Sequence, residues 1–335
     1  MNAAVRAVVR TCAFHKLGCF GIYQGYQGLI DNKMESMNAR SVKDIINKGG
    51  TILKSARCLE FRTTEGRKSA YENLIKNNID GLVVVGGDGS FTGAMIFQRE
   101  FSFPVIGIPG TIDNDIQGTR FTLGYDTALN TVIDAIDKIR DTASSHNRLF
   151  FVEVMGRDAG HIALSAGISG GADAILIPEI SWDIKSLAKK MNDVKASEKN
   201  FGLVIVAESA GSSLVAEYPQ AAHKFSDNQV GIGYKVADLI TETTESETRV
   251  TVLGHVQRGG TPNSRDRLFA SVFGVAAVDL IAQEKYNQLV VWADRKCIHI
   301  PLESAISKSH NVDPKGTLVA TARGLGIYVG NHTHS

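Results

Sequence analysis

Cysteine is scarce in this sequence, and its spacing excludes two kinds of small scaffold. The 335 residues contain only four cysteines, none of them in a CxxC pair, and no histidine-rich cluster accompanies them. Zinc sites and disulfide frameworks are built from such groupings, so neither is expected here. Four scattered thiols in a chain of this size are typical of a reducing cytoplasm.

The sequence also has little net charge and no long hydrophobic run. Thirty-six Lys and Arg balance 35 Asp and Glu, which leaves a net charge of +1. We therefore expect neither nucleic acid nor a membrane as a partner, and any cationic site for a charged substrate must be local. No apolar run approaches membrane-spanning length, and no signal peptide precedes the first predicted helix. The sequence thus predicts a cytoplasmic globular protein.

No GxxxxGK[ST] string occurs, so a P-loop is excluded, but two other glycine-rich turns are present. The apolar run Gly81–Gly87 is followed by Asp88, Gly89 and Ser90, and Pro104–Ile108 leads into the residues PGTIDND. Open α/β sheets bind ligands where strands end. Either motif alone is more often an ordinary tight turn, since Asp and Gly are common turn residues. Two such strand ends in succession favour one site for phosphate and metal.

Short apolar strands alternate with amphipathic helices, which predicts an α/β fold of doubly wound lobes with mainly parallel sheets. Helices are expected at Met1–Cys12, Ser41–Asn47, Glu72–Asn77, Phe91–Glu100, Asp126–Ser144, Asp158–Ile168, Ile184–Lys195, Gly231–Thr241 and Asp266–Ile281. Strands are expected at Phe20–Tyr23, Thr51–Ser55, Gly81–Gly87, Pro104–Ile108, Leu149–Val154, Ala174–Ile177, Leu203–Ala207 and Thr248–Leu253, and Leu289–Trp292 with Lys296–Ile300 as a hairpin. The last helix is expected to bury Leu268, Phe269, Val272, Val275, Ala276 and Leu280.

Several residues near these strand ends suit phosphoryl transfer, which needs positioning, charge neutralisation and a base near the attacking hydroxyl. Asp113 is the candidate general base, and Asp115 is either a second base or an orienting group. Asp88, among glycines, suits Mg²⁺. A sugar phosphate would need cations and planar donors, and the candidates are Arg148, Arg249, His255 and Arg258, with Glu208 for sugar hydroxyls. Each cation alone is more often a surface charge.

Four motifs carry a family resemblance. They are GGDGS at Gly86–Ser90, PGTIDND at Pro109–Asp115, VEVMGR at Val152–Arg157 and GHVQRGG at Gly254–Gly260. In this order and spacing, from Met1 to about Tyr328, the chain resembles the bacterial ATP-dependent 6-phosphofructokinases. The resemblance implies a glycolytic kinase that transfers the γ-phosphoryl group of ATP to the 1-hydroxyl of fructose 6-phosphate with Mg²⁺, as a homotetramer.

The resemblance also implies roles for individual residues. Asp113, Thr111 and Arg157 would be catalytic, and Asp88 would hold the metal. Arg57, Cys58, Gly87, Asp88, Gly89 and Ser90 would contact the nucleotide. Thr111, Ile112, Asp113, Arg148, Met155, Gly156, Arg157, Glu208, Arg249, His255 and Arg258 would contact the sugar phosphate, and Arg148 and Arg249 would do so in a neighbouring subunit. Gly89 and Gly110 stand where pyrophosphate-dependent relatives carry aspartate and lysine, which favours ATP as the donor.

Lobe boundaries and regulation are implied in the same way. A larger nucleotide-binding lobe would comprise residues 1–124 and 257–308, and a smaller sugar-phosphate lobe would comprise 125–256 and 309–335. Arg6, Arg10, Arg140, Asp173 and Lys199 match effector contacts. Ala39, Ser197 and Phe201 replace polar residues that many relatives have, so control by ADP or phosphoenolpyruvate is in question.

The family carries a first strand and a GGDxPG loop immediately before MNAA, and this sequence has neither. The N–H groups of such a loop would contact nucleotide phosphates. A misassigned start codon or a truncation would explain the difference. We expect the 335-residue polypeptide to be poorly soluble or nearly inactive, and an upstream segment with this loop to restore both properties.

Two other functions remain open on the sequence. NAD and lipid kinases also use a GGDG turn, although the spacing of TIDND, MGR and HVQRGG would then be unexplained. A non-catalytic paralogue that binds nucleotide or sugar phosphate is the second alternative; Asp88, Asp113 and Arg157 argue against it.

Overall fold

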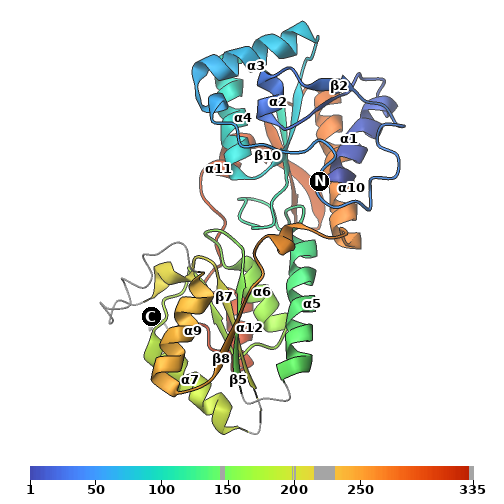
Figure 1. The fold of residues 1–335 in the computed structure, drawn as a ribbon. Coiled ribbons are helices and arrows are strands. Elements are labelled where there is room, and N and C mark those ends of the chain that lie inside the picture. The colour runs from blue at the N-terminus through green and yellow to red at the C-terminus, as the bar shows by residue number, and fades with distance from the viewer. Residues whose placement is uncertain (144–147, 198, 200, 215–230, 332–335) are drawn as a thin grey trace. The chain divides into compact units, whose positions relative to one another are not determined.

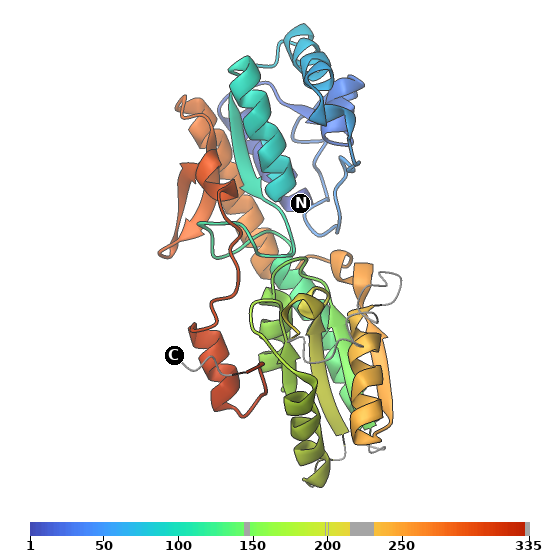
Figure 2. The same ribbon diagram turned by 90° about the vertical axis from the view of Figure 1, so that its left-hand side faces the viewer.

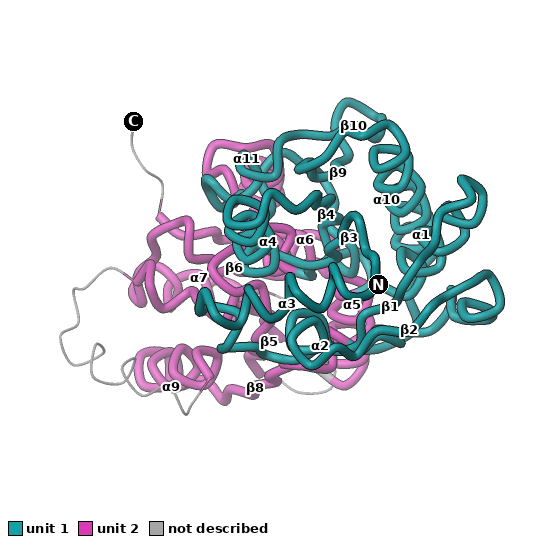
Figure 3. Tube along the Cα trace, turned by 90° about the horizontal axis from the view of Figure 1, so that it is seen from above, with its two compact units in different colours: residues 1–112, 116–127, 259–310 teal, residues 113–115, 128–258, 311–335 magenta. Residues whose placement is uncertain are grey.

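The fold comes from a computed structural model that describes residues 1–143, 148–197, 199, 201–214 and 231–331. The expected end of a helix at Ser144 and most of the C-terminal tail lie outside these residues. The chain divides into two compact units, each built from separate stretches of sequence (Figure 3). Unit 1 comprises Met1–Ile112, Ile116–Thr127 and Gly259–His310, and unit 2 comprises Asp113–Asp115, Ala128–Arg258 and Asn311–Ser335.

The main sheet of unit 1 has the strand order β10-β9-β4-β3. Its strands are β3 (Leu82–Gly86), β4 (Val105–Pro109), β9 (Gln288–Ala293) and β10 (Lys296–Pro301). β3, β4 and β9 are parallel, and β9 and β10 form the expected antiparallel hairpin. All five residues of β4 are buried, as a continuous apolar run in a parallel sheet should be. A small antiparallel ladder of β1 (Phe20–Ile22) and β2 (Met34–Ser36) stands apart from this sheet.

Helices cover both faces of the unit 1 sheet (Figures 1 and 2). They are α1 (Asn2–Phe14), α2 (Tyr26–Ile30), α3 (Thr64–Lys76), α4 (Asp88–Phe101), α10 (Ser264–Ala282) and α11 (Leu302–Ile306), with a 3-10 turn η1 (Glu60–Arg62). Alternate residues of β4 point to opposite faces. Val105 packs with residues of α3 and α4, whereas Ile106 and Ile108 pack with α1 and α10. The sheet is therefore doubly wound.

Unit 2 has a four-stranded parallel sheet in the order β6-β7-β5-β8. Its strands are β5 (Arg148–Val154), β6 (Ala174–Leu176), β7 (Phe201–Ala207) and β8 (Thr248–Val252). Its helices are α6 (His161–Ser169), α7 (Ile184–Ala196), α9 (Ile232–Thr244), α12 (Thr317–Gly324) and most of α5 (Tyr125–Ala143), with 3-10 turns η2 (Ala210–Ser213) and η3 (Gly254–Arg258). In Figure 1, α7 and α9 cover one face and α5 and α6 the other. The two doubly wound, mainly parallel sheets confirm the expected fold class. No helix in the described parts of the chain is long and apolar enough to cross a membrane.

The expected helix Ser41–Asn47 and strand Thr51–Ser55 are both wrong. Asp44 and Lys54 have φ angles of 56° and 60°, which neither a helix nor a strand accommodates. The segment is instead held to α1 by the Asn2 side chain. Its Nδ2 donates to the carbonyl of Lys48 at 3.0 Å, and its Oδ1 accepts from the N–H of Ile52 at 2.7 Å. Hydrogen bonds between residues far apart in the sequence therefore outweigh the helix and strand preferences of the local sequence.

The buried face of α10 is the expected one only in part, because Leu280 is buried and Phe269, Val272 and Ala276 pack against the core. Leu268 and Val275 are 62% and 42% exposed, whereas Phe273 and Ala277 are fully buried. The helix turns a face of small residues to α1, because a Cβ on Gly274 would lie only 2.5 Å from that of Ala7. Close approach of the two helices thus shifts the centre of the buried face to Phe273, Gly274 and Ala277, which leaves Leu268 and Val275 exposed. The helix α12, Thr317–Gly324, was not among the expected helices.

Candidate active site

The first cluster of expected site residues lies where β3 and β4 end side by side in unit 1. Gly86 pairs with Pro109 in register, and the N–H of Gly110 donates to the carbonyl of Gly86 at 2.7 Å. A Cβ on Gly87 would come within 3.4 Å of the Thr111 Cβ. The structure therefore brings the GGDGS and PGT residues together, as expected from two neighbouring strand ends.

Glycine is needed at some positions of this cluster and leaves open space at another. A Cβ on Gly86 would lie 2.5 Å from the Ser90 Oγ, and one on Gly110 would lie 3.0 Å from the Val85 Cγ1. A Cβ on Gly89 would meet nothing within 4 Å. This open position lies in the first turn of α4, whose N-terminal N–H groups favour an anion.

Asp88 is the first residue of α4 and is exposed, with Gly87 and Gly89 on either side. No group of three or more potential metal ligands occurs among the described residues. One exposed carboxylate beside an anion site fits Mg²⁺, which proteins usually bind through one or two carboxylates and substrate phosphates. Arg57 is exposed and Cys58 packs against the apolar cluster around Phe91; neither side chain makes a hydrogen bond within the described chain.

The TIDND segment joins the two units. Thr111 and Ile112 belong to unit 1, whereas Asp113 and Asp115 belong to unit 2. Both acids are half-buried. Asn114 between them is buried with φ at 55°, a left-handed conformation that asparagine tolerates better than most residues. The two carboxylates are therefore held on a sharply turned backbone.

A second cluster follows the carboxyl ends of β5, β7 and β8 in unit 2. The Glu208 Oε1 accepts hydrogen bonds from the N–H groups of Gly156 at 3.2 Å and Arg157 at 2.6 Å. A Cβ on Gly156 would lie 2.5 Å from the carbonyl oxygen of Ala159, so this turn requires glycine. Glu208 thus holds the MGR turn with one oxygen, and its Oε2 accepts no hydrogen bond within the described residues.

The HVQR segment forms η3 beside this turn. Gln257 is 1% exposed; its Oε1 accepts from the N–H of buried Met155 at 3.3 Å, and its Nε2 donates to the carbonyl of Gly254 at 3.2 Å. His255 and Arg258 are exposed on either side of it. Gln257 was not predicted from the sequence to anchor this segment, although its place between two candidate ligands was a signal.

Glu153, also missed from the sequence, lies at the end of β5 and anchors α9. Its Oε2 accepts from the N–H of Gly233 at 2.8 Å, and a Cβ on Gly231 would lie 2.5 Å from the same oxygen. Burial raises the pKa of this carboxyl above its ordinary value of 4.5. Its polar position among apolar residues of a predicted strand was the only sequence signal.

We predict that the free energy of unfolding of the Glu153→Gln variant increases relative to that of the wild type as the pH rises. The raised pKa means that the folded protein favours the protonated carboxyl. Glu153 therefore contributes its full stability below the unfolded-state pKa of 4.5, and this stability is lost as the pH rises through the folded-state pKa. Gln keeps an acceptor for Gly233 without the buried charge. Urea unfolding of both proteins between about pH 4 and pH 8 measures this. A stability difference that does not change with pH would contradict the assignment.

Arg148 and Arg249 lie at the opposite edge of the same sheet. Arg148 begins β5, which has seven residues, so it is about 20 Å from the carboxyl end at roughly 3.3 Å per residue. The Arg148 Nε donates to the Glu247 Oε2 at 2.7 Å, and the Arg249 Nη2 pairs with the Glu247 Oε1. Arg148 and Arg249 hold the pKa of Glu247 below its ordinary value. The structure therefore does not bring these arginines to the Arg157 cluster of their own unit.

Three of the expected effector residues gather at this amino edge too. The Lys199 Nζ lies 2.7 Å from both carboxylate oxygens of Asp173, and the Arg140 Nη2 donates to the carbonyls of Gly170 and Gly171. Both cations lie over the Phe201 ring, at 5.2 Å for Lys199 and 5.6 Å for Arg140. Phe201 thus gives a cation–π contact in place of a polar one. Arg6 and Arg10 are on α1 of unit 1.

The chain matches known proteins along nearly its whole length. The family model described as "Phosphofructokinase" matches residues 1–281. An "ATP-dependent 6-phosphofructokinase" of Bacillus pumilus is 49% identical over 313 residues, 93% of this chain and 92% of the relative. An "ATP-dependent 6-phosphofructokinase 2" of Bacteroides thetaiotaomicron is 45% identical over 327 residues, 98% of this chain and 94% of the relative.

Solved structures agree with the sequence comparison. The phosphofructokinase of Saccharomyces cerevisiae superimposes with a TM-score of 0.82 at 35% identity, and the match covers 98% of this chain. This chain spans less than half, 45%, of that yeast chain. A pyrophosphate-dependent phosphofructokinase of Marinobacter aquaeolei has a TM-score of 0.79 at 17% identity, which shows the fold alone. The protein belongs to the phosphofructokinase family.

Proposed function

We propose that this chain is a glycolytic ATP-dependent 6-phosphofructokinase. It transfers the γ-phosphoryl group of ATP to the 1-hydroxyl of fructose 6-phosphate and releases fructose 1,6-bisphosphate and ADP. The observation that carries the proposal is the pairing of β3 with β4, which puts the GGDGS turn beside the PGT residues. The bacterial relatives whose names specify this activity cover the same residues. A cytoplasmic location remains a prediction.

The nucleotide-binding lobe is proposed to comprise residues 1–124 and 257–308, most of which belong to unit 1. The N–H groups at the start of α4 and the open space at Gly89 receive the phosphates. Mg²⁺, when bound at Asp88, would neutralise phosphate charge. Arg57 and Cys58 are proposed as further contacts to the nucleotide, and Cys58 contributes through its backbone because its side chain packs in the core.

The sugar-phosphate lobe is proposed to comprise residues 125–256 and 309–335, most of which belong to unit 2, and Asp113, Thr111 and Arg258 reach its ligand from outside these bounds. The Glu208 Oε2 accepts from sugar hydroxyls while its Oε1 fixes the turn that carries Arg157. His255 and Arg258 bind the phosphate dianion, with Met155 and Gly156 forming the adjacent wall. Asp113 removes the proton of the attacking hydroxyl, Thr111 donates to the transferring group, and Arg157 stabilises its developing charge.

Arg148 and Arg249 are proposed to complete the site of a second subunit in a homotetramer. Their place toward the amino edge of the sheet supports this, because Arg148 is about one strand length away from the carboxyl end of β5, where Arg157 follows, and Arg249 shares Glu247 with it. The Asp173, Lys199 and Arg140 group is proposed as half of an effector site, with Arg6 and Arg10 from another subunit. Ala39 and Ser197 offer little to a ligand there, so response to ADP or phosphoenolpyruvate is expected to be weak.

The choice of donor tests the proposed function. With fructose 6-phosphate as acceptor, we expect turnover with MgATP and none with pyrophosphate, and no product when NAD replaces the sugar. Turnover with pyrophosphate as the only phosphoryl donor, or phosphorylation of NAD, would contradict the proposed function.

The space at Gly89 gives this test a matched pair of variants. We expect Gly89→Asp to raise the KM for ATP at least tenfold, because a carboxylate would then face the phosphates. Gly89→Ala should change it little, since a Cβ there meets nothing within 4 Å. Thermal unfolding should be the same for both. Equal KM values in the two variants would place the nucleotide elsewhere.

A further inference from the structure

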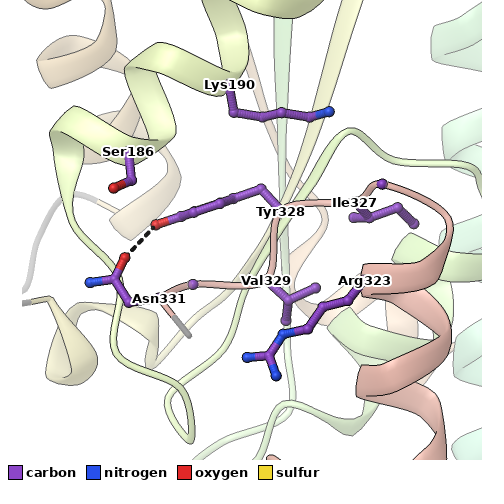
Figure 4. A pocket seen from close by; sticks show the side chains of 9 residues that line it. Ser186, Lys190, Arg323, Ile327, Tyr328, Val329 and Asn331 are labelled. Atoms are coloured by element: carbon purple, nitrogen blue, oxygen red, sulfur yellow. Dashed lines mark hydrogen bonds between the residues drawn. The ribbon is translucent and has the colours of Figure 1, made fainter. Parts of the chain in front are cut away.

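A hollow of about 530 Å³ in unit 2 adjoins the Asp173 group described above. Residues of α7, of α12 and of the segment after α12 line it, and the Tyr328 ring lies between Lys190 and Arg323 (Figure 4). The N–H of Tyr328 donates to the carbonyl of Asp173 at 3.0 Å. The hollow therefore belongs to a region that already has a proposed role, whereas a contact between Gly49 and Gly260 in unit 1 has none.

Gly49 and Gly260 are far apart in the sequence, yet their backbones are in direct contact. A Cβ on Gly49 would lie 2.2 Å from the carbonyl oxygen of Gly260 and 3.3 Å from its carbonyl carbon. The φ angle of Gly49 is not in the left-handed region, so its conformation would suit other residues as well. Position 49 therefore requires glycine because of the backbone opposite it and not because of its own conformation.

The Gly49 side of this contact is fixed to α1 by the side chain of Asn2, which is 1% exposed. The Asn2 Nδ2 donates to the carbonyls of Lys48 at 3.0 Å and Gly49 at 3.1 Å, and the Oδ1 accepts from the N–H of Ile52 at 2.7 Å. Loss of these hydrogen bonds would leave a buried amide unpaired. The Gly49 backbone thus resists displacement.

The Gly260 side belongs to the GHVQRGG motif, two residues after the proposed phosphate ligand Arg258. Gln257 is hydrogen-bonded to Met155 in unit 2, and the division between the units falls between Arg258 and Gly259. Arg258 therefore has one anchor directly before it, at Gln257, and a second one shortly after it, at the Gly49–Gly260 contact. Without the second anchor, two consecutive glycines would leave the backbone after Arg258 free to adopt many conformations.

We propose that Gly49 is a positioning residue, which holds Arg258 in place for the phosphate of the sugar through the backbone of Gly260. This rests on the proposed function, because that function assigns Arg258 to the sugar phosphate. A side chain at position 49 would push Gly260 away, since the atoms that it would meet are backbone atoms and cannot rotate aside. Arg258 would move with Gly260, and its guanidinium would lose its alignment with the phosphate oxygens.

Replacing Gly49 with alanine tests this role against a matched control. We expect Gly49→Ala to raise the KM for fructose 6-phosphate about tenfold, as loss of a charged hydrogen bond predicts, with much smaller changes in kcat and in the KM for ATP. Gly18→Ala should change none of these constants, because a Cβ there meets nothing within 4 Å and the residue lies in the same unit. An unchanged KM for fructose 6-phosphate in Gly49→Ala, or an equal rise in both KM values, would overturn the proposal.

A double-mutant cycle shows whether the effect passes through Arg258. Arg258→Ala alone should raise the KM for fructose 6-phosphate. Adding Gly49→Ala should raise it no further, because the side chain that Gly49 positions is already absent. Two effects that multiply would mean that Gly49 does not act through Arg258.

Limited cleavage by trypsin after the exposed Arg258 tests the anchor without any turnover. We expect this cleavage to be several-fold faster in Gly49→Ala than in the wild type or Gly18→Ala, because a released glycine pair fits the protease more readily. Equal cleavage rates would contradict the anchor. Faster cleavage in Gly49→Ala, together with a wild type that does not phosphorylate fructose 6-phosphate, would count against the proposed function and not against the anchor.

Asn2→Asp covers the case in which Gly49→Ala fails to fold. Aspartate keeps the shape of the side chain and the acceptor for Ile52, but it cannot donate to the carbonyls of Lys48 and Gly49. We expect the same two changes at smaller size, a higher KM for fructose 6-phosphate and faster cleavage after Arg258. Wild-type values of both in Asn2→Asp would refute the proposal.

Discussion

Replacing Asp113 with asparagine is expected to lower kcat by about 10²–10⁴-fold, the usual contribution of a positioned general base. Asparagine has nearly the same shape, so the turned backbone at Asn114 should be retained. The KM for fructose 6-phosphate should change much less, because the proposed phosphate contacts His255 and Arg258 are untouched. Steady-state kinetics with saturating MgATP measures both constants.

Asp115 provides the matched control for this experiment. It is also half-buried and belongs to the same unit, so it is the one other acid of this segment that can act as base. We expect Asp115→Asn to lower kcat clearly less than Asp113→Asn does. A larger loss at Asp115 would exchange the two roles, and near wild-type kcat in Asp113→Asn would remove Asp113 from the mechanism.

The central part of the candidate site was predictable because it depends on local sequence. A buried parallel strand must end in a turn, and the turns after β3 and β4 meet because neighbouring strands pair in register. Glycine and aspartate at these turns are visible in the sequence without knowledge of any distant contact. Pairing of the two strands was the only tertiary assumption, and it is correct.

The two site residues that were not predicted act through hydrogen bonds to residues far away in the sequence. Gln257 holds the N–H of Met155 from 102 positions away, and Glu153 holds that of Gly233 from 80 positions away. A polar residue inside a predicted strand or beside a predicted ligand does not reveal such a partner. The failed helix at Ser41–Asn47 has a related cause, because the side chain of Asn2 holds the residues that follow it, at Lys48, Gly49 and Ile52.

The wide separation of Arg148 and Arg249 from Arg157 leads to a prediction about assembly. If these arginines complete a neighbour's site, Arg249→Ala and Asp113→Asn chains are each nearly inactive alone. Mixed with full subunit exchange at equal amounts, they should regain about a quarter of the wild-type activity, because that share of sites combines an intact Asp113 with an intact Arg249. Activity of the mixture, with exchange followed by a mass tag, is the measurement.

A second mixture separates shared sites from simple stabilisation of one chain by another. Arg148→Ala mixed with Arg249→Ala should stay inactive, because Arg148 and Arg249 lie on one edge of one sheet, where Glu247 binds both, and so are donated together. Every donating chain in that mixture lacks one of the two cations. Recovery in the first mixture but not in the second requires that Asp113 and Arg249 of one site come from different chains. No recovery in either, with exchange demonstrated, would mean that each site is built within a single chain and that the amino-edge arginines serve only to hold Glu247.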